Sequence, residues 1–166
     1  DGFIPEYRTF ELYQRPNKND VNGRVILGKK KDEVLDGGNN DDYLDGKKGN
    51  DILDGGIGGD TLLGGKGDDM LIGGGNKVCD WFDMKCQADV LVGGKGADAF
   101  ILGEGNIDIK DFSAVDSLLI AKGIASSSNL QSEQQGNDVL LSSPNGLNTI
   151  VRDTSLGSVV NMIQYI

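Results

Sequence analysis

An apolar side chain recurs at every ninth residue through the middle of this chain, and its two neighbours in each copy are more variable. In a short strand, the central residue faces the opposite way from the residues on either side of it. The pattern therefore predicts a ladder of three-residue strands, each with one inward-facing side chain. The predicted inward residues, whose spacing is interrupted once after Leu71, are Leu35, Leu44, Leu53, Leu62, Leu71, Leu91 and Phe100.

Glycine dominates the segments between these strands. The complete nine-residue copies are Gly37–Asp45, Gly46–Asp54, Gly55–Leu63, Gly64–Ile72 and Gly93–Ile101. A degenerate copy, Gly28–Asp36, precedes them, and a broken copy opens at Gly73 and closes at Val92. We number the positions of each copy so that positions 1 to 6 form a loop and positions 7 to 9 form the strand. Glycine enters the positive-φ region without steric cost, which suits tight loops.

Aspartate occupies position 6 of nearly every copy, which gives the consensus GGxGxDxLx. These aspartates are Asp42, Asp51, Asp60, Asp69, Asp89 and Asp98. The repeat resembles the RTX (repeats-in-toxin) family of secreted bacterial proteins, in which this nonapeptide is a calcium-binding signature. The resemblance implies an all-β fold: a right-handed parallel β-roll with two nonapeptides per turn and calcium held between the loops of successive turns. A looser likeness to the family's C-terminal flank extends to Asp111, Phe112 and Asp116.

Eighteen residues per turn would stack loops that are two copies apart. We therefore expect Asp42, Asp60 and Asp89 to line one edge of the roll. Glu33, Asp51, Asp69 and Asp98 would line the other edge. Glu33 is longer than aspartate by one methylene and follows three lysines, so we expect its loop to form a poor or empty site.

Calcium takes six to eight hard oxygen ligands, and loop carbonyls would supply those that the aspartates do not. Asp111 and Asp116 are further candidate ligands, and we expect about four to five ions in total. The candidate carbonyls are those of Gly37, Asn39, Asp41, Gly46, Lys48, Asn50, Gly55, Ile57, Gly59, Gly64, Lys66 and Asp68.

The predicted core is too thin to fold by itself. Burying one leucine is worth about 1.5–3 kcal/mol, while fixing the backbone of each residue costs about 1–2 kcal/mol. One inward side chain per nine residues does not offset that cost. Each stack of carboxylates also repels itself until a cation is bound. We therefore expect the chain to be unfolded without calcium.

Two details of the loops depart from the consensus. Asn40 and Lys47 replace glycine at positions that favour positive φ, which asparagine tolerates better than lysine. Lys48, Lys66 and Lys95 occupy a variable loop position, where we expect them to dilute the negative charge of a solvated edge.

An insertion at residues 76–88 contains both cysteines and the single tryptophan. We expect Cys79 and Cys86 to form a disulfide, which suits an oxidising extracellular setting. Trp81 and Phe82 lie between them. These two aromatic residues either fold back onto the roll or form an exposed knob that contacts a protein or a sugar.

The roll is predicted over residues 28–101, with residues 1–27 and 102–166 as β-rich caps. Alternating residues predict a strand at Tyr7–Tyr13, and the last nine residues fit either a strand or a short helix. Because the outward strand positions become apolar toward Ile101, we expect the flanks to fold over the C-terminal half of the roll. In the RTX family, the C-terminal region also carries the type I secretion signal.

Composition narrows the possible functions. The 166 residues carry a net charge of −10, which argues against nucleic acid as a partner. The chain has no histidine, which removes the commonest general base, and we expect no catalytic activity of its own. No apolar run is long enough to span a membrane.

We interpret the chain as a monomeric module excised from a longer protein that is secreted or displayed on a bacterial surface. Two functions remain open. One is calcium-dependent folding that accompanies secretion, and the other is calcium-dependent binding of a polysaccharide or protein through the roll face or the Trp81 loop.

Overall fold

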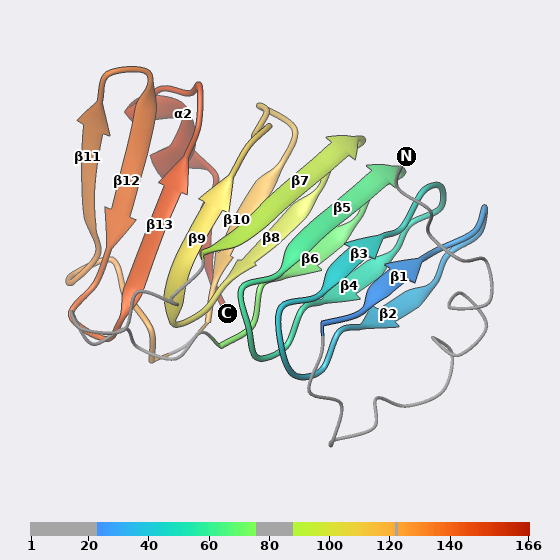
Figure 1. Cartoon of the computed structure of the whole chain (residues 1–166). Helices are drawn as coiled ribbons and strands as arrows, with labels where there is room; N and C mark the ends of the chain where they lie inside the picture. The colour runs from blue at the N-terminus through green and yellow to red at the C-terminus, as the bar shows by residue number, and fades with distance from the viewer. Residues whose placement is uncertain (1–22, 76–87, 122) are drawn as a thin grey trace.

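The computed structural model describes residues 23–75, 88–121 and 123–166, which fold into two stacked β-sheets and one short helix (Figure 1). Residues 76–87, which include Cys79, Cys86, Trp81 and Phe82, lie outside the described residues, as do residues 1–22. The predictions made for them stay predictions. Within the described residues, no helix is both long and apolar enough to cross a membrane.

The chain alternates between the two sheets along the repeats. The first sheet contains, in spatial order, β1 (Val25–Leu27), β3 (Tyr43–Asp45), β5 (Thr61–Lys66), β7 (Asp89–Lys95), β9 (Gly105–Ile109), β13 (Leu147–Val151), β12 (Asp138–Ser142) and β11 (Gln131–Gln135). The second contains β2 (Val34–Asp36), β4 (Ile52–Asp54), β6 (Met70–Ile72), β8 (Ala99–Leu102), β10 (Ser117–Ile120) and β14 (Ile163–Tyr165). All strand pairs within the repeats are parallel.

The register confirms a parallel roll with two nonapeptides per turn. Leu44 pairs with Leu62, and Leu53 pairs with Leu71, in each case 18 residues further along the chain. Where the insertion interrupts the repeat, Leu62 instead pairs with Leu91. The extra residues therefore lengthen one loop without shifting the ladder. The ladder also extends one strand before residue 28, because β1 pairs with β3.

The inward ladder predicted from the sequence is fully buried. Each strand from β1 to β7 buries one apolar side chain, whereas β8 buries two, Phe100 and Leu102. β9 buries Ile107 and Ile109, and β10 buries Leu118 and Ile120. The core is therefore thin along the repeats and thicker at the C-terminal end.

The C-terminal region extends the two sheets and does not cover their outer faces. β9 and β10 continue the parallel ladder, and β13 and β14 pair in parallel onto them. The expectation that this flank folds over the roll is therefore wrong. The outward apolar side chains are half-buried because they stack on one another along the sheet, as Ile72 does on Ile101. The last residues form both a helix, α2 (Leu156–Asn161), and a strand, β14.

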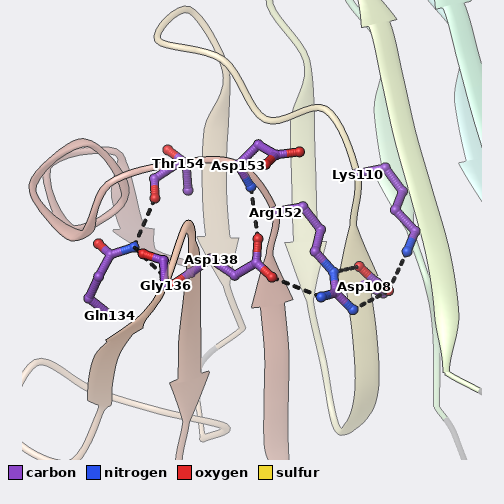
Figure 2. Close-up of polar contacts among 8 residues, drawn as sticks. All are labelled: Asp108, Lys110, Gln134, Gly136, Asp138, Arg152, Asp153 and Thr154. Atoms are coloured by element: carbon purple, nitrogen blue, oxygen red, sulfur yellow. Dashed lines mark hydrogen bonds and ion pairs between the residues drawn. The ribbon is translucent and has the colours of Figure 1, made fainter.

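An arginine joins the antiparallel end of the first sheet to the last parallel strand of the ladder (Figure 2). Arg152 donates to both carboxylate oxygens of Asp108 on β9, at 2.9 and 3.0 Å, and to Asp138 on β12 at 2.9 Å. Burial raises the pKa of Asp108, but the hydrogen bonds from Arg152 and Lys110 outweigh burial and hold that pKa below its usual value. These contacts fix the β11–β12 hairpin to the roll.

The inward ladder predicts a large difference between two substitutions. Leu62→Ala removes a side chain with 0% exposure and should lower the free energy of unfolding, measured in saturating calcium, by about 2–5 kcal/mol. Val34→Ala is the control, because Val34 is 69% exposed and should change that free energy by less than about 0.5 kcal/mol. Denaturant titration measures both, and similar losses would contradict the single-residue core.

Candidate calcium sites

The position 6 side chains stack in two columns, one along each edge of the roll. We call column A the loops that enter the first sheet and column B the loops that enter the second. Column A holds Asp42, Asp60 and Asp89. Column B holds Glu33, Asp51, Asp69, Asp98 and Asp116. All these side chains are buried.

One oxygen of each aspartate joins successive turns. The backbone N–H of Asp42 donates to Oδ1 of Asp60 at 2.7 Å, and the N–H of Asp60 donates to Oδ1 of Asp89 at 2.9 Å. Column B repeats the pattern from Glu33 through Asp116. Oδ1 of each position 6 aspartate therefore joins two turns, and Oδ2 takes no part in that hydrogen bond.

The second oxygen is buried without a donor in the middle of both columns. Oδ2 of Asp51, Asp60 and Asp69 accepts no hydrogen bond from the described residues. A buried anionic oxygen without a partner is unfavourable, and a cation would satisfy it. Because the oxygen belongs to a carboxylate, the cation that fits is a hard one such as calcium.

A glycine at position 1 leaves space beside each of these oxygens. A Cβ atom at Gly55 would lie 2.5 Å from Oδ2 of Asp60 and 2.7 Å from the carbonyl oxygen of Gly73, one turn later. A carboxylate oxygen and a carbonyl oxygen from adjacent turns thus approach the same glycine. Gly46 and Gly64 have the same surroundings. A larger residue would fill the space that a cation needs.

Backbone carbonyls must complete any such site. Among the described residues, no three acidic side chains are gathered closely enough to hold a metal ion by themselves. Some predicted carbonyls also accept inter-turn or local hydrogen bonds: that of Lys66 accepts from Gly49 N–H at 2.9 Å, and that of Gly46 accepts from Lys48 N–H at 3.1 Å. Asn40 and Lys47 have the expected positive φ, at 78° and 74°.

Burial raises the pKa values of several position 6 aspartates when no metal is bound. It raises the pKa of Asp60 to about 7, with a further contribution from neighbouring carboxylates such as Asp42, although a backbone hydrogen bond opposes the shift. Burial likewise raises the pKa of Asp51 and of Asp98 to about 6. Asp51 and Asp60, whose Oδ2 atoms lack a hydrogen-bond donor, therefore hold protons more tightly than ordinary aspartates.

Comparison with known proteins agrees with this geometry. The family model described as the RTX calcium-binding nonapeptide repeat (four copies) matches residues 25–53, 54–76 and 87–106. The three matched segments are therefore RTX calcium-binding repeats, interrupted at residues 77–86. No curated protein matches the chain.

Two solved structures are similar to this chain. One is the extracellular lipase LipA from Serratia marcescens, with a TM-score of 0.44 and 14% identity over 87% of this chain. The other is the AlgE6R3 subunit of the Azotobacter vinelandii mannuronan C5-epimerase, with a TM-score of 0.31 and 22% identity, covering 82% of this chain and 80% of that one. This chain spans 40% of the lipase chain.

The two columns of the RTX roll end differently from their middles. Column A begins at Arg24, whose N–H donates to Oδ1 of Asp42 at 2.5 Å and whose Nε lies 3.7 Å from the same oxygen. Arg24 precedes Asp42 by 18 residues, so it occupies position 6 of the previous turn. Column A stops where Asp89 meets Ile107. The sequence analysis missed Arg24, although its spacing from Asp42 marks its place.

Local donors occupy the carboxylates at both ends of column B. Oε2 of Glu33 accepts from Lys29 N–H at 2.5 Å, and Oδ2 of Asp116 accepts from Ser113 N–H at 2.7 Å. Asp111 lies one turn after Gly93, and both of its oxygens accept backbone N–H groups, from Gly93 and Gly94. In these three side chains, the second carboxylate oxygen accepts a backbone N–H, whereas Oδ2 of the central aspartates accepts none.

A second row of side chains at position 5 runs outside column B. Asn50 N–H donates to Oδ1 of Asp32 at 2.8 Å, and Asp68 N–H donates to Oδ1 of Asn50 at 3.0 Å. Here the later turn donates to the earlier one, the reverse of column B. The sequence analysis proposed only the carbonyls of Asn50 and Asp68 and missed this use of their side chains.

The middle and the end of the columns should respond differently to substitution. Asp60 has stacked aspartates on both sides, so Asp60→Ala should remove about two bound ions and raise the calcium midpoint of folding. Glu33→Ala should leave both nearly unchanged, because its carboxylate is held by a local N–H. Calorimetric calcium titration measures the stoichiometry, and equal losses for the two variants would refute the assignment of columns.

The raised pKa values predict an unusual pH dependence for the metal-free chain. The folded chain binds more protons than the unfolded chain between about pH 4, where free aspartate titrates, and the folded pKa values of about 6 and about 7. In chelator, acidification from about pH 7 to about pH 5 should therefore favour folding.

With calcium present, the same protons compete with the metal for the carboxylates of the folded chain, so the folded chain should bind calcium more weakly and release more protons per ion at the lower pH. Calorimetric calcium titration at both pH values measures this competition, and circular dichroism in chelator measures the effect of pH on folding. Calcium binding to the folded chain that is independent of pH would contradict the role of these aspartates.

Proposed function

We propose that this chain is the calcium-dependent folding module of a secreted protein, disordered at the low calcium concentration of the cytosol and folded outside the cell. The observation that carries the proposal is the set of buried Oδ2 atoms of Asp51, Asp60 and Asp69, which have no hydrogen-bond donor. Calcium supplies the missing positive charge. Because each ion would contact two turns, its binding free energy is also folding free energy.

The proposed ligands are the position 6 carboxylates and the loop carbonyls beside them. Consecutive aspartates enclose two intervals in column A and three in column B. The last interval ends at Asp116, whose Oδ2 has a local donor. Roughly four to five calcium ions are therefore expected.

The module is proposed to act without catalysing a reaction. It would comprise the RTX roll and a C-terminal β cap over residues 102–166, with the type I secretion signal in that cap. The disulfide between Cys79 and Cys86 would form after export, since disulfides persist in oxidising surroundings. Any enzymatic or adhesive activity would then belong to other parts of the same protein.

The thin ladder explains how the chain could stay unfolded during export and still fold outside the cell. One inward leucine per nine residues gives too little burial to balance the loss of chain entropy. Without calcium, only the thin core and the hydrogen bonds between turns oppose the repulsion of the stacked carboxylates. The chain would remain extended until it meets external calcium.

Calcium removal should unfold the chain reversibly. We expect the β signal in circular dichroism to disappear in chelator at neutral pH and to return when calcium is added in excess. Magnesium at the same concentration should restore little of it, because magnesium demands stricter octahedral geometry and keeps its water. A β signal that survives chelation would refute the proposal.

A further inference from the structure

Lysine occupies position 3 on four successive turns of column B. We call these residues the lysine row: Lys30, Lys48, Lys66 and Lys95. Lys66 and Lys95 are register partners in adjacent strands. Gly49 N–H donates to the carbonyl of Lys66, which places the loop of Lys48 one turn before it. Asn50 N–H donates to Asp32, which places the loop of Lys30 one turn earlier again.

The side chains of the lysine row are exposed, and none forms an ion pair with another described residue. By contrast, Lys47 pairs with Asp45, and Lys110 pairs with Asp108. Stacked turns lie one strand spacing apart, at about 4.8 Å, so the row aligns like charges at an unfavourable separation. An anion that follows the row would remove this repulsion.

The row belongs to one edge only. Position 3 of column A holds Asn39, Ile57 and Gly75, none of which is charged. Apart from Lys110, every lysine that the structure describes lies in a loop of column B. A chain with a net charge of −10 thus gathers its lysines on a single edge.

Two exposed acidic residues, Asp32 and Asp68, lie near the row, and each keeps its charge while its Oδ1 accepts a backbone N–H. The loops of column B hold seven lysines, which outnumber these two: Lys29, Lys30, Lys31, Lys47, Lys48, Lys66 and Lys95. Beneath them, the calcium of the proposed function would neutralise the buried carboxylates of column B. The calcium-loaded edge therefore presents a net positive charge to solvent.

We infer that the lysine row binds a linear acidic polysaccharide that carries one carboxylate per sugar, a function beyond calcium-dependent folding. A row of single charges about 4.8 Å apart matches a linear anion with charges at comparable intervals. Double-stranded DNA carries a charge every ~3.4 Å along each strand, out of step with the row. Single-stranded nucleic acid is bound by stacking on aromatic side chains, and the described loops of column B expose none.

The test measures the affinity of the calcium-loaded chain for hexagalacturonate by calorimetry. The row variant is Lys48→Gln/Lys66→Gln/Lys95→Gln. The control variant, Lys29→Gln/Lys31→Gln/Lys47→Gln, removes the same charge from the first two loops of column B at positions outside the row. We expect the row variant to lose at least about tenfold in affinity and the control to lose less than about threefold. Equal losses would overturn the inference, as would binding of single-stranded DNA as tight as that of the oligosaccharide.

Two further measurements distinguish a loss of polysaccharide binding from a loss of folding. Circular dichroism of each variant in calcium establishes that it is folded, so a failure of calcium-dependent folding is seen independently of binding. On the unmodified protein, hexagalacturonate should protect Lys48, Lys66 and Lys95 from acetylation, with Lys110 as the unprotected reference. Mass spectrometry measures this, and equal acetylation with and without the oligosaccharide would overturn the inference.

Discussion

The structure depends on the stacking of buried carboxylates one strand spacing apart. The same geometry that lets Oδ1 of Asp60 accept an N–H from the previous turn brings its charge close to that of Asp42 and Asp89. It also buries Oδ2 without a donor. The glycine at position 1 leaves open the space beside that oxygen. The same side chains therefore join successive turns by hydrogen bonds and repel one another by their charge. A bound cation would neutralise that charge.

This conflict is concentrated in the middle of the molecule. At the column ends, the next carboxylate is replaced. Arg24 stands at position 6 of the turn before Asp42, with its guanidinium Nε 3.7 Å from Oδ1 of Asp42, and the N–H of Ser113 donates to Oδ2 of Asp116. β9 and β10 bury two side chains each, and Arg152 fixes the hairpin onto the roll. The dependence on metal should thus decrease from the repeats toward the C-terminal end, where ordinary burial and hydrogen bonding take over.

A nine-residue repeat with two copies per turn makes two distinct edges from one consensus. Because two copies make one turn, a residue at a variable position such as position 3 lies next to the residue at the same position two copies away, and not next to that of the following copy. On column B this collects lysines, and on column A it collects uncharged residues. Position 5 uses both edges, because Asp41 on column A and Asp32, Asn50 and Asp68 on column B all accept inter-turn hydrogen bonds in the reverse direction to position 6.

The sequence by itself determined the inward ladder, because the nine-residue period fixes which side chain faces inward. The roll and the separation of the position 6 aspartates into two edges followed from the resemblance to the RTX family, since the period alone does not set the number of copies per turn. The sequence also predicted positive φ at Asn40 and Lys47. Only the tertiary structure decided how the two carboxylate oxygens divide their roles, since hydrogen bonding between turns depends on atoms far apart in the chain. It likewise decided that Arg24 closes column A and that the C-terminal flank extends the sheets. Outside the repeats, no period fixes which strands pair. The outward apolar residues suggested that the flanks fold over them, but these residues are half-buried by stacking on one another along the sheet.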